Sequence, residues 1–212
     1  MKLYTFWRSS AAYRARIALN MKGLAYESAS KKLGAGEQNA PDYRAINPQA
    51  LVPALEDGGQ LYAQSLALIE YLDETHPEPP LLPKDPPGRA HVRSMALAIA
   101  CDIHPLNNLR VLNYLKGPLA QPQAAVDAWY RHWVAEGFRG LEELAKRHSG
   151  DGAHLYGAQV TLADVCLVPQ MYNARRFDTD LSPYPTLVAI DASLSKIAAF
   201  AAARPEVQPD AA

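Results

Sequence analysis

The sequence has 212 residues, 49% of them apolar, and a formal net charge of −1 at pH 7. This composition allows a buried core in one large or two small domains, and the small net charge gives no general attraction to nucleic acid or to an anionic membrane. No segment approaches the roughly 20 apolar residues of a membrane span, and the N-terminal apolar run is too short for a signal peptide. The two cysteines, Cys101 and Cys166, have neither disulfide-framework nor metal-site spacing. We therefore expect a cytoplasmic protein without a bound metal, and no nucleic-acid or membrane partner.

The first third of the chain alternates strand and helix patterns, a pattern that predicts a small mixed sheet with helices packed on it. Gly23 follows the first helical pattern as a C-terminal cap. Gly58 and Gly59 lie in a hairpin turn between two strand patterns. In chain order, the expected elements are a strand at residues 3–6, a helix at 9–21, a strand at 26–30, a loop at 33–41, strands at 54–55 and 61–63 and a helix at 65–74.

A proline-rich segment separates this region from the remainder. Six prolines fall within residues 76–88, and proline cannot continue a helix, so the segment predicts a linker. Beyond it the sequence is rich in Ala and Leu and shows no clear strand pattern. Thr161 and Asp164 fit a capping box at the start of a helix. The expected helices lie at residues 89–114, 122–148, 161–177 and 189–203. We predict an α+β domain at 1–82, a linker at 83–88 and an all-helical domain at 89–212.

The clearest candidate for an anion site lies where the first strand turns into the first helix. Arg8, Ser9 and Ser10 occupy this turn, and free backbone amides and the helix dipole attract anions to such a position. A serine hydroxyl there can donate a hydrogen bond to a thiolate and lower the pKa of the thiol. Serines are also good helix N-caps whatever the function. The residue pattern by itself favours that structural interpretation.

Two later segments could bind a peptide-like ligand. Val52-Pro53 enters a strand after the loop opened by Asn47, and a tight turn there would present the Val52 backbone for pairing with an extended ligand. Gln64 and Ser65 begin the next helix, where a hydroxyl and helix amides favour a carboxylate. An ordinary trans-proline at an edge strand and a simple helix cap are the structural alternatives.

The helical region contains one polar cluster within an Ala- and Leu-rich helix pattern. Cys101, His104 and Asn108 have the spacing of one helix face. A lone histidine without a second ligand four residues away argues against a metal site. Farther on, Arg175-Arg176 ends a helical pattern and could be a solvated charged end.

These signals gain weight together because they resemble one family over essentially the whole chain. Residues 8–19, Arg-Ser-Ser-Ala-Ala-Tyr-Arg-Ala-Arg-Ile-Ala-Leu, resemble the zeta-class glutathione transferase signature Ser-Ser-Cys-x-Trp-Arg-x-Arg-Ile-Ala-Leu. The family includes the maleylacetoacetate and maleylpyruvate isomerases. Other segments that resemble it in order and spacing are Asn47-Pro48, Val52-Pro53, Gln64-Ser65, Leu81-Leu82-Pro83, Asp102-Ile103-His104-Pro105-Leu106, Thr161-Leu162-Ala163-Asp164 and Gln208-Pro209-Asp210.

The resemblance implies a thioredoxin-like N-terminal domain, a helical C-terminal domain, a homodimer and glutathione as cofactor. By motif position, Ser9 would stabilise the glutathione thiolate, with Ser10 beside it at the helix start. Ala11 replaces the signature cysteine, so an essential protein thiol at that position is excluded. Tyr13 replaces the signature tryptophan, which is a milder departure.

The same resemblance implies the remaining glutathione contacts. Val52 would pair with the cysteinyl backbone, beside a cis Pro53. Gln64 and Ser65 would hold the γ-glutamyl end, and Gln38 would lie near the glycyl carboxylate.

For the substrate, the resemblance implies a small maleyl dicarboxylate whose cis double bond is isomerised to trans. Arg8, Arg110 and Arg176 are the cationic candidates for its carboxylates, because a guanidinium binds carboxylate with two parallel donors. The resemblance implies that His104 and Asn108 also shape the substrate site. Arg110 resembles the maleylpyruvate isomerases in particular.

Three functions remain open from the sequence. The first is the isomerase, in breakdown of aromatic compounds. The second is a transferase that uses the same thiolate site on small α-halo acids or other electrophiles and consumes glutathione. The third is a non-enzymatic binding module, against which the intact Ser9, Gln64 and Ser65 and the set of arginines argue.

Overall fold

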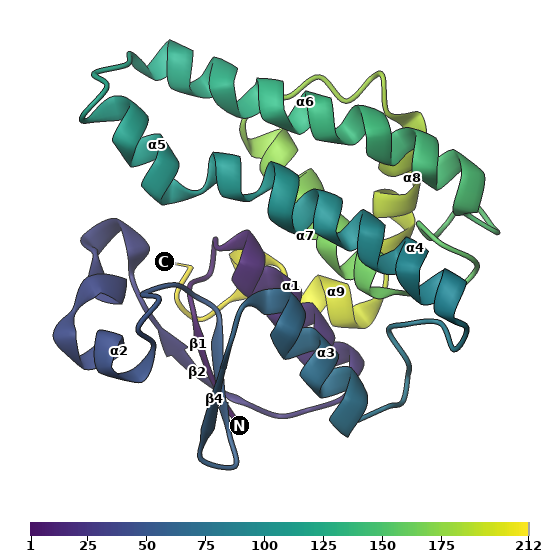
Figure 1. Ribbon diagram of the computed structural model, residues 1–212, viewed down its shortest axis with the longest axis horizontal. Helices are drawn as coiled ribbons and strands as arrows, with labels where there is room; N and C mark the ends of the chain where they lie inside the picture. Colours follow the sequence, from purple (N-terminus) through teal and green to yellow (C-terminus); the bar gives the residue numbers. More distant parts are fainter. Residues whose placement is uncertain (212) are drawn as a thin grey trace. The chain divides into compact units, whose positions relative to one another are not determined.

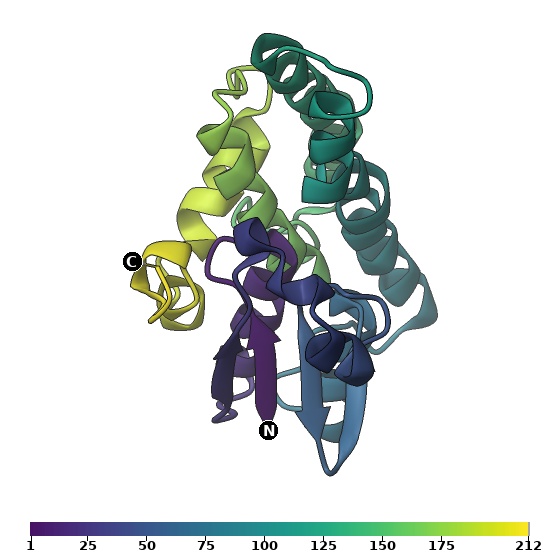
Figure 2. The same cartoon turned by 90° about the vertical axis from the view of Figure 1, so that its left-hand side faces the viewer.

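The computed structural model describes residues 1–211, which form two compact units (Figures 1 and 2). Unit 1 comprises Met1–Pro80 together with the segment that begins at Lys196, and unit 2 comprises Leu81–Ser195. No helix within residues 1–211 is long and apolar enough to cross a membrane.

Unit 1 is built on a four-stranded mixed sheet in the order β2-β1-β3-β4. The strands are β1 (Lys2–Thr5), β2 (Glu27–Ser30), β3 (Ala54–Asp57) and β4 (Gln60–Ala63). Strand β1 runs parallel to β2 and antiparallel to β3, and β3 and β4 form the predicted hairpin. The hairpin turn has positive φ at Gly58 and Gly59, which a side chain would disfavour.

Alternation along the strands gives the sheet two apolar faces. On one face, Tyr4 and Ala54 pack with Tyr43 of helix α2 (Pro41–Ile46), and the Tyr4 and Tyr43 ring centroids are 5.5 Å apart. The other face carries the buried side chains of Leu3 and Leu55. Helices α1 (Ser10–Met21) and α3 (Ser65–Thr75) pack against each other on that side (Figure 1).

The C-terminal segment completes unit 1. Helix α9 (Ala198–Ala202) packs along α1 and buries Phe200 completely. The Asn20 side-chain amide donates to the Ala199 carbonyl at 3.0 Å, which fastens the two helices together. A short 3₁₀ turn, η5 (Pro205–Val207), follows.

Unit 2 is all-helical within the part of it that the structure describes. Helix α7 is central, because α4, α8 and the π-helical turn η3 all pack against it, and α6 packs against α8 and η3. The elements are α4 (Pro86–Leu97), η3 (Ala98–Ile103), η4 (Pro105–Asn107), α5 (Leu109–Lys116), α6 (Gln123–His148), α7 (Leu162–Arg176) and α8 (Pro185–Leu194).

Three sequence expectations differ from the structure. The helix expected at 89–114 is interrupted, because Pro105 starts a 3₁₀ turn and Asn108 is extended before α5 begins. The helix expected at 189–203 is two helices, α8 in unit 2 and α9 in unit 1. The loop expected at 33–41 contains two 3₁₀ turns, η1 (Leu33–Ala35) and η2 (Glu37–Asn39), and leads into α2.

The unit boundaries also fall elsewhere than the expected domain limits of 1–82, 83–88 and 89–212. The chain passes from unit 1 to unit 2 at Pro80, inside the proline-rich segment, and α4 begins at Pro86 within the expected linker. Proline at the first position of a helix is favourable because its missing N–H has no partner to lose there. The largest difference is the return of the chain to unit 1 at Lys196.

Candidate glutathione and substrate site

Ser9 caps the N-terminus of α1. Its backbone is extended (φ −69°, ψ 118°), its Oγ accepts from the Ala12 N–H at 3.3 Å, and its N–H donates to the Phe6 carbonyl at 3.0 Å. The Ser9 hydroxyl hydrogen meets no acceptor within residues 1–211. The hydroxyl therefore keeps a donor for an anion at the positive end of the helix.

The neighbours of Ser9 are arranged differently. Ser10, the first residue of α1, is 6% exposed, so its side chain belongs to the interior. Arg8 is exposed, and its guanidinium carbon lies 5.2 Å from the Trp7 ring centroid. The cation–π contact orients a guanidinium that remains open to solvent and to an anionic ligand.

Arg16 holds this turn through its buried guanidinium. It was not predicted as a site residue from the sequence. The side chain is completely buried, with Nη1 3.1 Å from Thr5 Oγ1 and Nη2 2.9 Å from the Trp7 carbonyl. Burial lowers the pKa of Arg16 to about 10, so the guanidinium is still charged at neutral pH. The Arg-x-Arg spacing in residues 14–16 was visible, but only the fold shows that the second arginine points inward.

The Val52-Pro53 peptide bond is cis, as the family resemblance implied. The preceding Leu51 carbonyl accepts from Tyr43 Oη at 2.7 Å and from Asn47 Nδ2 at 2.9 Å, which fixes the loop. The Val52 N–H and C=O make no hydrogen bond within residues 1–211. A backbone segment with both groups unpaired can hold an extended peptide-like ligand as an added strand.

Tyr43 was not predicted as a site residue from the sequence, and Asn47 was predicted only as the start of the loop. Both side chains are buried, and Asn47 Oδ1 also accepts from the Gln49 N–H at 3.1 Å. The Asn-Pro pair was the available signal for Asn47, because asparagine before proline favours a turn closed by its side chain.

Gln64 and Ser65 stand at the start of α3, as expected. Gln64 has φ +69° and ψ 117°, a strained conformation for a residue with a side chain. Its Nε2 donates to Gln49 Oε1 at 2.7 Å. Ser65 is buried, and its Oγ accepts from Arg14 Nη1 at 3.4 Å, so Arg14 connects α1 with the start of α3.

Gln38 lies in η2, and its side-chain Oε1 is buried without a hydrogen-bond partner among the described residues. A carboxylate ligand would need the Nε2 end of this amide, since only that end donates. The unpaired buried oxygen shows that the local packing leaves the acceptor end of the amide unsatisfied.

In unit 2, the polar residues around 101–110 do not share one helix face, so this expectation is wrong. His104 lies between η3 and η4, whereas Asn108 caps α5 and accepts from the Arg110 N–H at 3.2 Å. The helix that carries Cys101 does not continue to Asn108, because Pro105 starts a 3₁₀ turn and the Asn108 backbone is extended. Arg110 is exposed in the first turn of α5. No cluster of three or more His, Cys, Asp or Glu side chains suited to a metal occurs within residues 1–211.

Arg175 and Arg176 end helix α7 with different partners. Arg175 Nη2 lies 2.6 Å from Oδ2 of the buried Asp191 on α8. Arg176 is exposed, and its guanidinium carbon lies 4.6 Å from the Phe177 ring centroid. The Phe177 ring in turn stacks on Tyr130, with centroids 3.6 Å apart. Arg175 is therefore held in an ion pair with α8, whereas Arg176, which makes no ion pair within residues 1–211, is the one available to a ligand.

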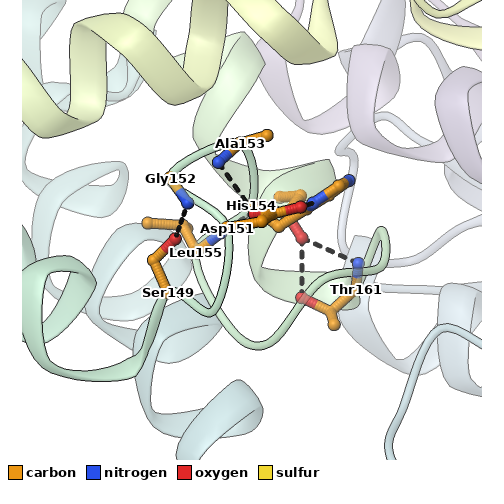
Figure 3. Close-up of polar contacts among 8 residues, drawn as sticks. Ser149, Asp151, Gly152, Ala153, His154, Leu155 and Thr161 are labelled. Carbon is orange, nitrogen blue, oxygen red and sulfur yellow. Dashed lines mark hydrogen bonds and ion pairs between the residues drawn. The ribbon is translucent and has the colours of Figure 1, made fainter.

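The start of α7 is held by the predicted capping box (Figure 3). Asp164 Oδ2 accepts from the Thr161 N–H at 2.8 Å and from the Thr161 hydroxyl at 2.9 Å, and Oδ1 accepts from the Leu155 N–H at 2.7 Å. Burial raises the pKa of Asp164 to about 6, against the opposing effect of these hydrogen bonds. In the same loop, Asp151 Oδ2 lies 2.9 Å from His154 Nδ1.

Comparison with known proteins supports the arrangement in both units. Residues 3–80 match the family described as glutathione S-transferase, N-terminal domain. The chain is 52% identical over 211 residues to a probable maleylacetoacetate isomerase of Vibrio cholerae, an alignment that covers 99% of this chain and 97% of the relative.

Two solved structures are similar over their whole length. The holo structure of a maleyl pyruvate isomerase, a bacterial zeta-class glutathione S-transferase, is 47% identical with a TM-score of 0.98, and 100% of each chain is covered. Maleylacetoacetate isomerase from Methylobacterium extorquens AM1, with bound malonate and glutathione, is 41% identical with a TM-score of 0.96 and the same full coverage. The predicted fold, a thioredoxin-like domain followed by a helical domain, is confirmed by these likenesses.

Proposed function

Since the chain belongs to the zeta-class glutathione transferases and is a glutathione-dependent isomerase of the maleylacetoacetate and maleylpyruvate type, we propose which of its residues carry that reaction. The observation that carries the proposal is that two polar groups of unit 1 have no hydrogen-bond partner within residues 1–211. These are the Ser9 hydroxyl hydrogen at the start of α1 and the Val52 backbone beside the cis Pro53.

The donor set of unit 1 fits glutathione. The free Val52 N–H and C=O match the amide groups of a tripeptide, and the start of α3 at Gln64 and Ser65 offers helix amides to its γ-glutamyl carboxylate. Gln38 would contact the glycyl carboxylate through its Nε2, the donor end of the side-chain amide. Unit 1 thus offers a complementary group to each of three parts of glutathione: its peptide backbone, its γ-glutamyl carboxylate and its glycyl end.

Ser9 is the residue that we assign to the thiolate. Its hydroxyl donates to the sulfur while its own oxygen stays fixed by the Ala12 N–H, and the helix dipole adds positive potential. Both effects favour the ionised thiol. When bound, glutathione supplies the sulfur nucleophile that opens the cis double bond to rotation and then leaves unchanged. Ala11 cannot supply a thiol, so the protein contributes none at this position.

Exposed arginines supply the charges for a dicarboxylate substrate. Arg8 in unit 1 and Arg110 and Arg176 in unit 2 each have an accessible guanidinium, and no ion pair involves them within residues 1–211. Each is a candidate to bind a substrate carboxylate or to stabilise negative charge that develops on the substrate oxygen during the reaction. His104 and Asn108 would shape the same substrate site.

The choice between maleylpyruvate and maleylacetoacetate rests on a narrower argument. Three guanidinium groups suit a short, strongly anionic substrate, and the exposed Arg110 supports maleylpyruvate. A homodimer and a cytoplasmic location are supported by the family resemblance.

The test is an ultraviolet assay of both maleyl substrates, with and without a catalytic amount of glutathione. We expect isomerisation that requires glutathione and returns it unconsumed, with maleylpyruvate the faster substrate. Consumption of thiol on dichloroacetate or an aryl halide, without isomerisation of either maleyl compound, would instead establish the transferase.

Ser9→Ala is the matching variant, with Ser28→Ala as control because Ser28 is an exposed serine of the same unit. Loss of the thiolate donor should reduce kcat/KM by roughly 100-fold, a typical effect of removing one donor from a developing or bound charge. Equal rates for the two variants would refute the assignment of Ser9.

A further inference from the structure

The turn that presents Ser9 is held from both sides at a single residue, Trp7, through the two peptide units that flank its Cα. The Trp7 N–H donates to Asp210 Oδ2 at 3.0 Å, and the Trp7 carbonyl accepts from Arg16 Nη2 at 2.9 Å. Asp210 lies 203 residues away along the sequence, in the segment that returns to unit 1. Trp7 is two residues before Ser9, so the orientation of the two peptide planes on either side of its Cα sets where Arg8 and Ser9 emerge.

Both clamping groups are anchored in turn. The same Asp210 oxygen accepts from Ser30 Oγ at 2.5 Å at the end of β2. Arg16 Nε donates to the Ala203 carbonyl at 3.1 Å, just past α9. The segment after Lys196 therefore contacts the turn directly through Asp210 and indirectly through Arg16. A carboxylate acceptor and a guanidinium donor form the stronger, charge-assisted type of hydrogen bond.

The geometry points to Asp210 and Arg16 as positioning residues for the Ser9 hydroxyl. On this inference, the C-terminal segment helps to position the Ser9 hydroxyl, and it does so through the backbone N–H and C=O of Trp7. The inference rests on the proposed role of Ser9. The inference adds to the role of Ser9 a requirement for Asp210 and Arg16, which act through the Trp7 backbone and not through glutathione or substrate.

A purely structural role for Asp210 would weaken the binding of every glutathione analogue alike. A positioning role predicts a selective effect on the ionised sulfur. The two roles are distinguished by comparing glutathione, whose thiol ionises, with S-methylglutathione, whose sulfur cannot. The experiment titrates the bound glutathione thiol by its ultraviolet thiolate absorbance and measures the affinity for S-methylglutathione by calorimetry.

Asp210→Ala removes the acceptor, and Asp210→Asn keeps an oxygen acceptor but removes the charge. Glu206→Ala is the control, because Glu206 is an exposed acid in the same segment. We expect the acid dissociation constant of the bound thiol to fall about tenfold in Asp210→Ala and by less in Asp210→Asn. Affinity for S-methylglutathione should stay within about twofold of the wild-type value, since that ligand has no thiolate to stabilise. Glu206→Ala should behave as wild type in both measurements.

Amide hydrogen exchange of Trp7 gives a readout that does not involve the ligand. Its rate should rise in the order wild type, Asp210→Asn, Asp210→Ala, parallel to the thiol pKa. If Asp210→Ala does not fold, the Asp210→Asn variant carries the same comparison. Faster Trp7 exchange with an unchanged thiol pKa would overturn the inference, as would an equal loss of affinity for both ligands.

Ser9→Ala, titrated in the same way, separates this inference from the proposed function. A raised thiol pKa in Ser9→Ala with no shift in Asp210→Ala would overturn the positioning role alone. No shift in Ser9→Ala would overturn the thiolate assignment and the inference together.

Discussion

Arg175 and Arg176 are adjacent in sequence and have different structural roles. The pattern alone allowed both to be a solvated charged end, and the family resemblance selected Arg176. The structure supplies the physical reason. Arg175 neutralises the buried Asp191 at 2.6 Å, whereas Arg176 rests on the Phe177 ring with its guanidinium exposed. No sequence pattern shows which of two neighbouring arginines at a helix end meets a buried acid from another helix.

This difference makes the two arginines a matched pair of variants. Arg175→Ala should lower the free energy of unfolding by about 1–2 kcal/mol, because the buried Asp191 carboxylate loses its ion pair with Arg175. Arg176→Ala should leave stability nearly unchanged and raise the KM for the maleyl substrate by roughly tenfold, the effect of losing one carboxylate contact. Chemical denaturation and steady-state kinetics measure the two effects. The reverse assignment, with stability lost only in Arg176→Ala, would contradict the prediction.

At the proposed glutathione site, the residues assigned to the ligand were easier to predict from the sequence than the residues that hold them in place. Ser9, Val52 and Gln64 lie at the predicted places because strand ends and helix starts are recognisable from short motifs. Tyr43 and Arg16 were missed because each acts through a backbone carbonyl that only the folded chain brings near. Side-chain contacts to main-chain atoms eight or nine residues away leave no trace in the strand and helix patterns of the sequence.

Among the elements, helix α7 has the most clearly defined start. Its capping box was predicted from Thr161 and Asp164, and the structure confirms it with a further donor, the Leu155 N–H. The same local logic failed for the segment before α5, where an Ala- and Leu-rich pattern masked the break at Pro105 and Asn108. A proline inside an Ala- and Leu-rich pattern often marks a helix boundary that the spacing of apolar residues does not show.

The Asp164 carboxyl predicts an unusual dependence of stability on pH. Its pKa is raised to about 6 in the folded chain from an ordinary value of 3.8, so the folded state holds the proton more tightly than the unfolded state. The resulting stability is fully present below pH 3.8 and is lost as the pH rises through about 6. The contribution is on the order of 2–3 kcal/mol.

Asp164→Asn tests this, with Thr161→Ser as a control that keeps the hydroxyl. The free energy of unfolding should be lower in Asp164→Asn than in wild type, because an amide cannot accept all three donors. The deficit should grow as the pH is lowered from 7 to 4, since only the wild type gains from protonation. Denaturant titrations at several pH values measure it, and a deficit that shrinks on acidification would be the contrary result.

For the molecule as a whole, the sequence predicted two domains and their classes but not the return of the chain to the first. Residues 189–203 looked like one helix of the second domain because their composition matches it. In the structure, α9 belongs to unit 1, where Tyr13 Oη donates to the Phe200 carbonyl at 3.5 Å. Membership of a unit depends on which surface a short apolar helix covers, and composition does not encode that choice.

Phe200→Ala should therefore impair unit 1. Phe200 is completely buried, and truncation of a buried phenylalanine typically costs about 3–5 kcal/mol. The loss should appear as weaker glutathione binding as well as a lower unfolding midpoint. Val207→Ala, an exposed position in the same segment, should change neither quantity. Unaltered glutathione affinity in a destabilised Phe200→Ala protein would show that the segment does not support the site.

The discontinuous make-up of unit 1 has a consequence for biosynthesis. A ribosome releases the strands and helices of residues 1–80 long before the segment that begins at Lys196 emerges. Throughout that interval Arg16 lacks the Ala203 carbonyl and Trp7 lacks the Asp210 carboxylate. The nascent N-terminal region can collapse, but the turn at residues 7–9 gains these contacts only after the whole helical unit has been translated. On the role proposed for Asp210, the binding of glutathione at Ser9 therefore depends on residues translated both before and after the helical unit.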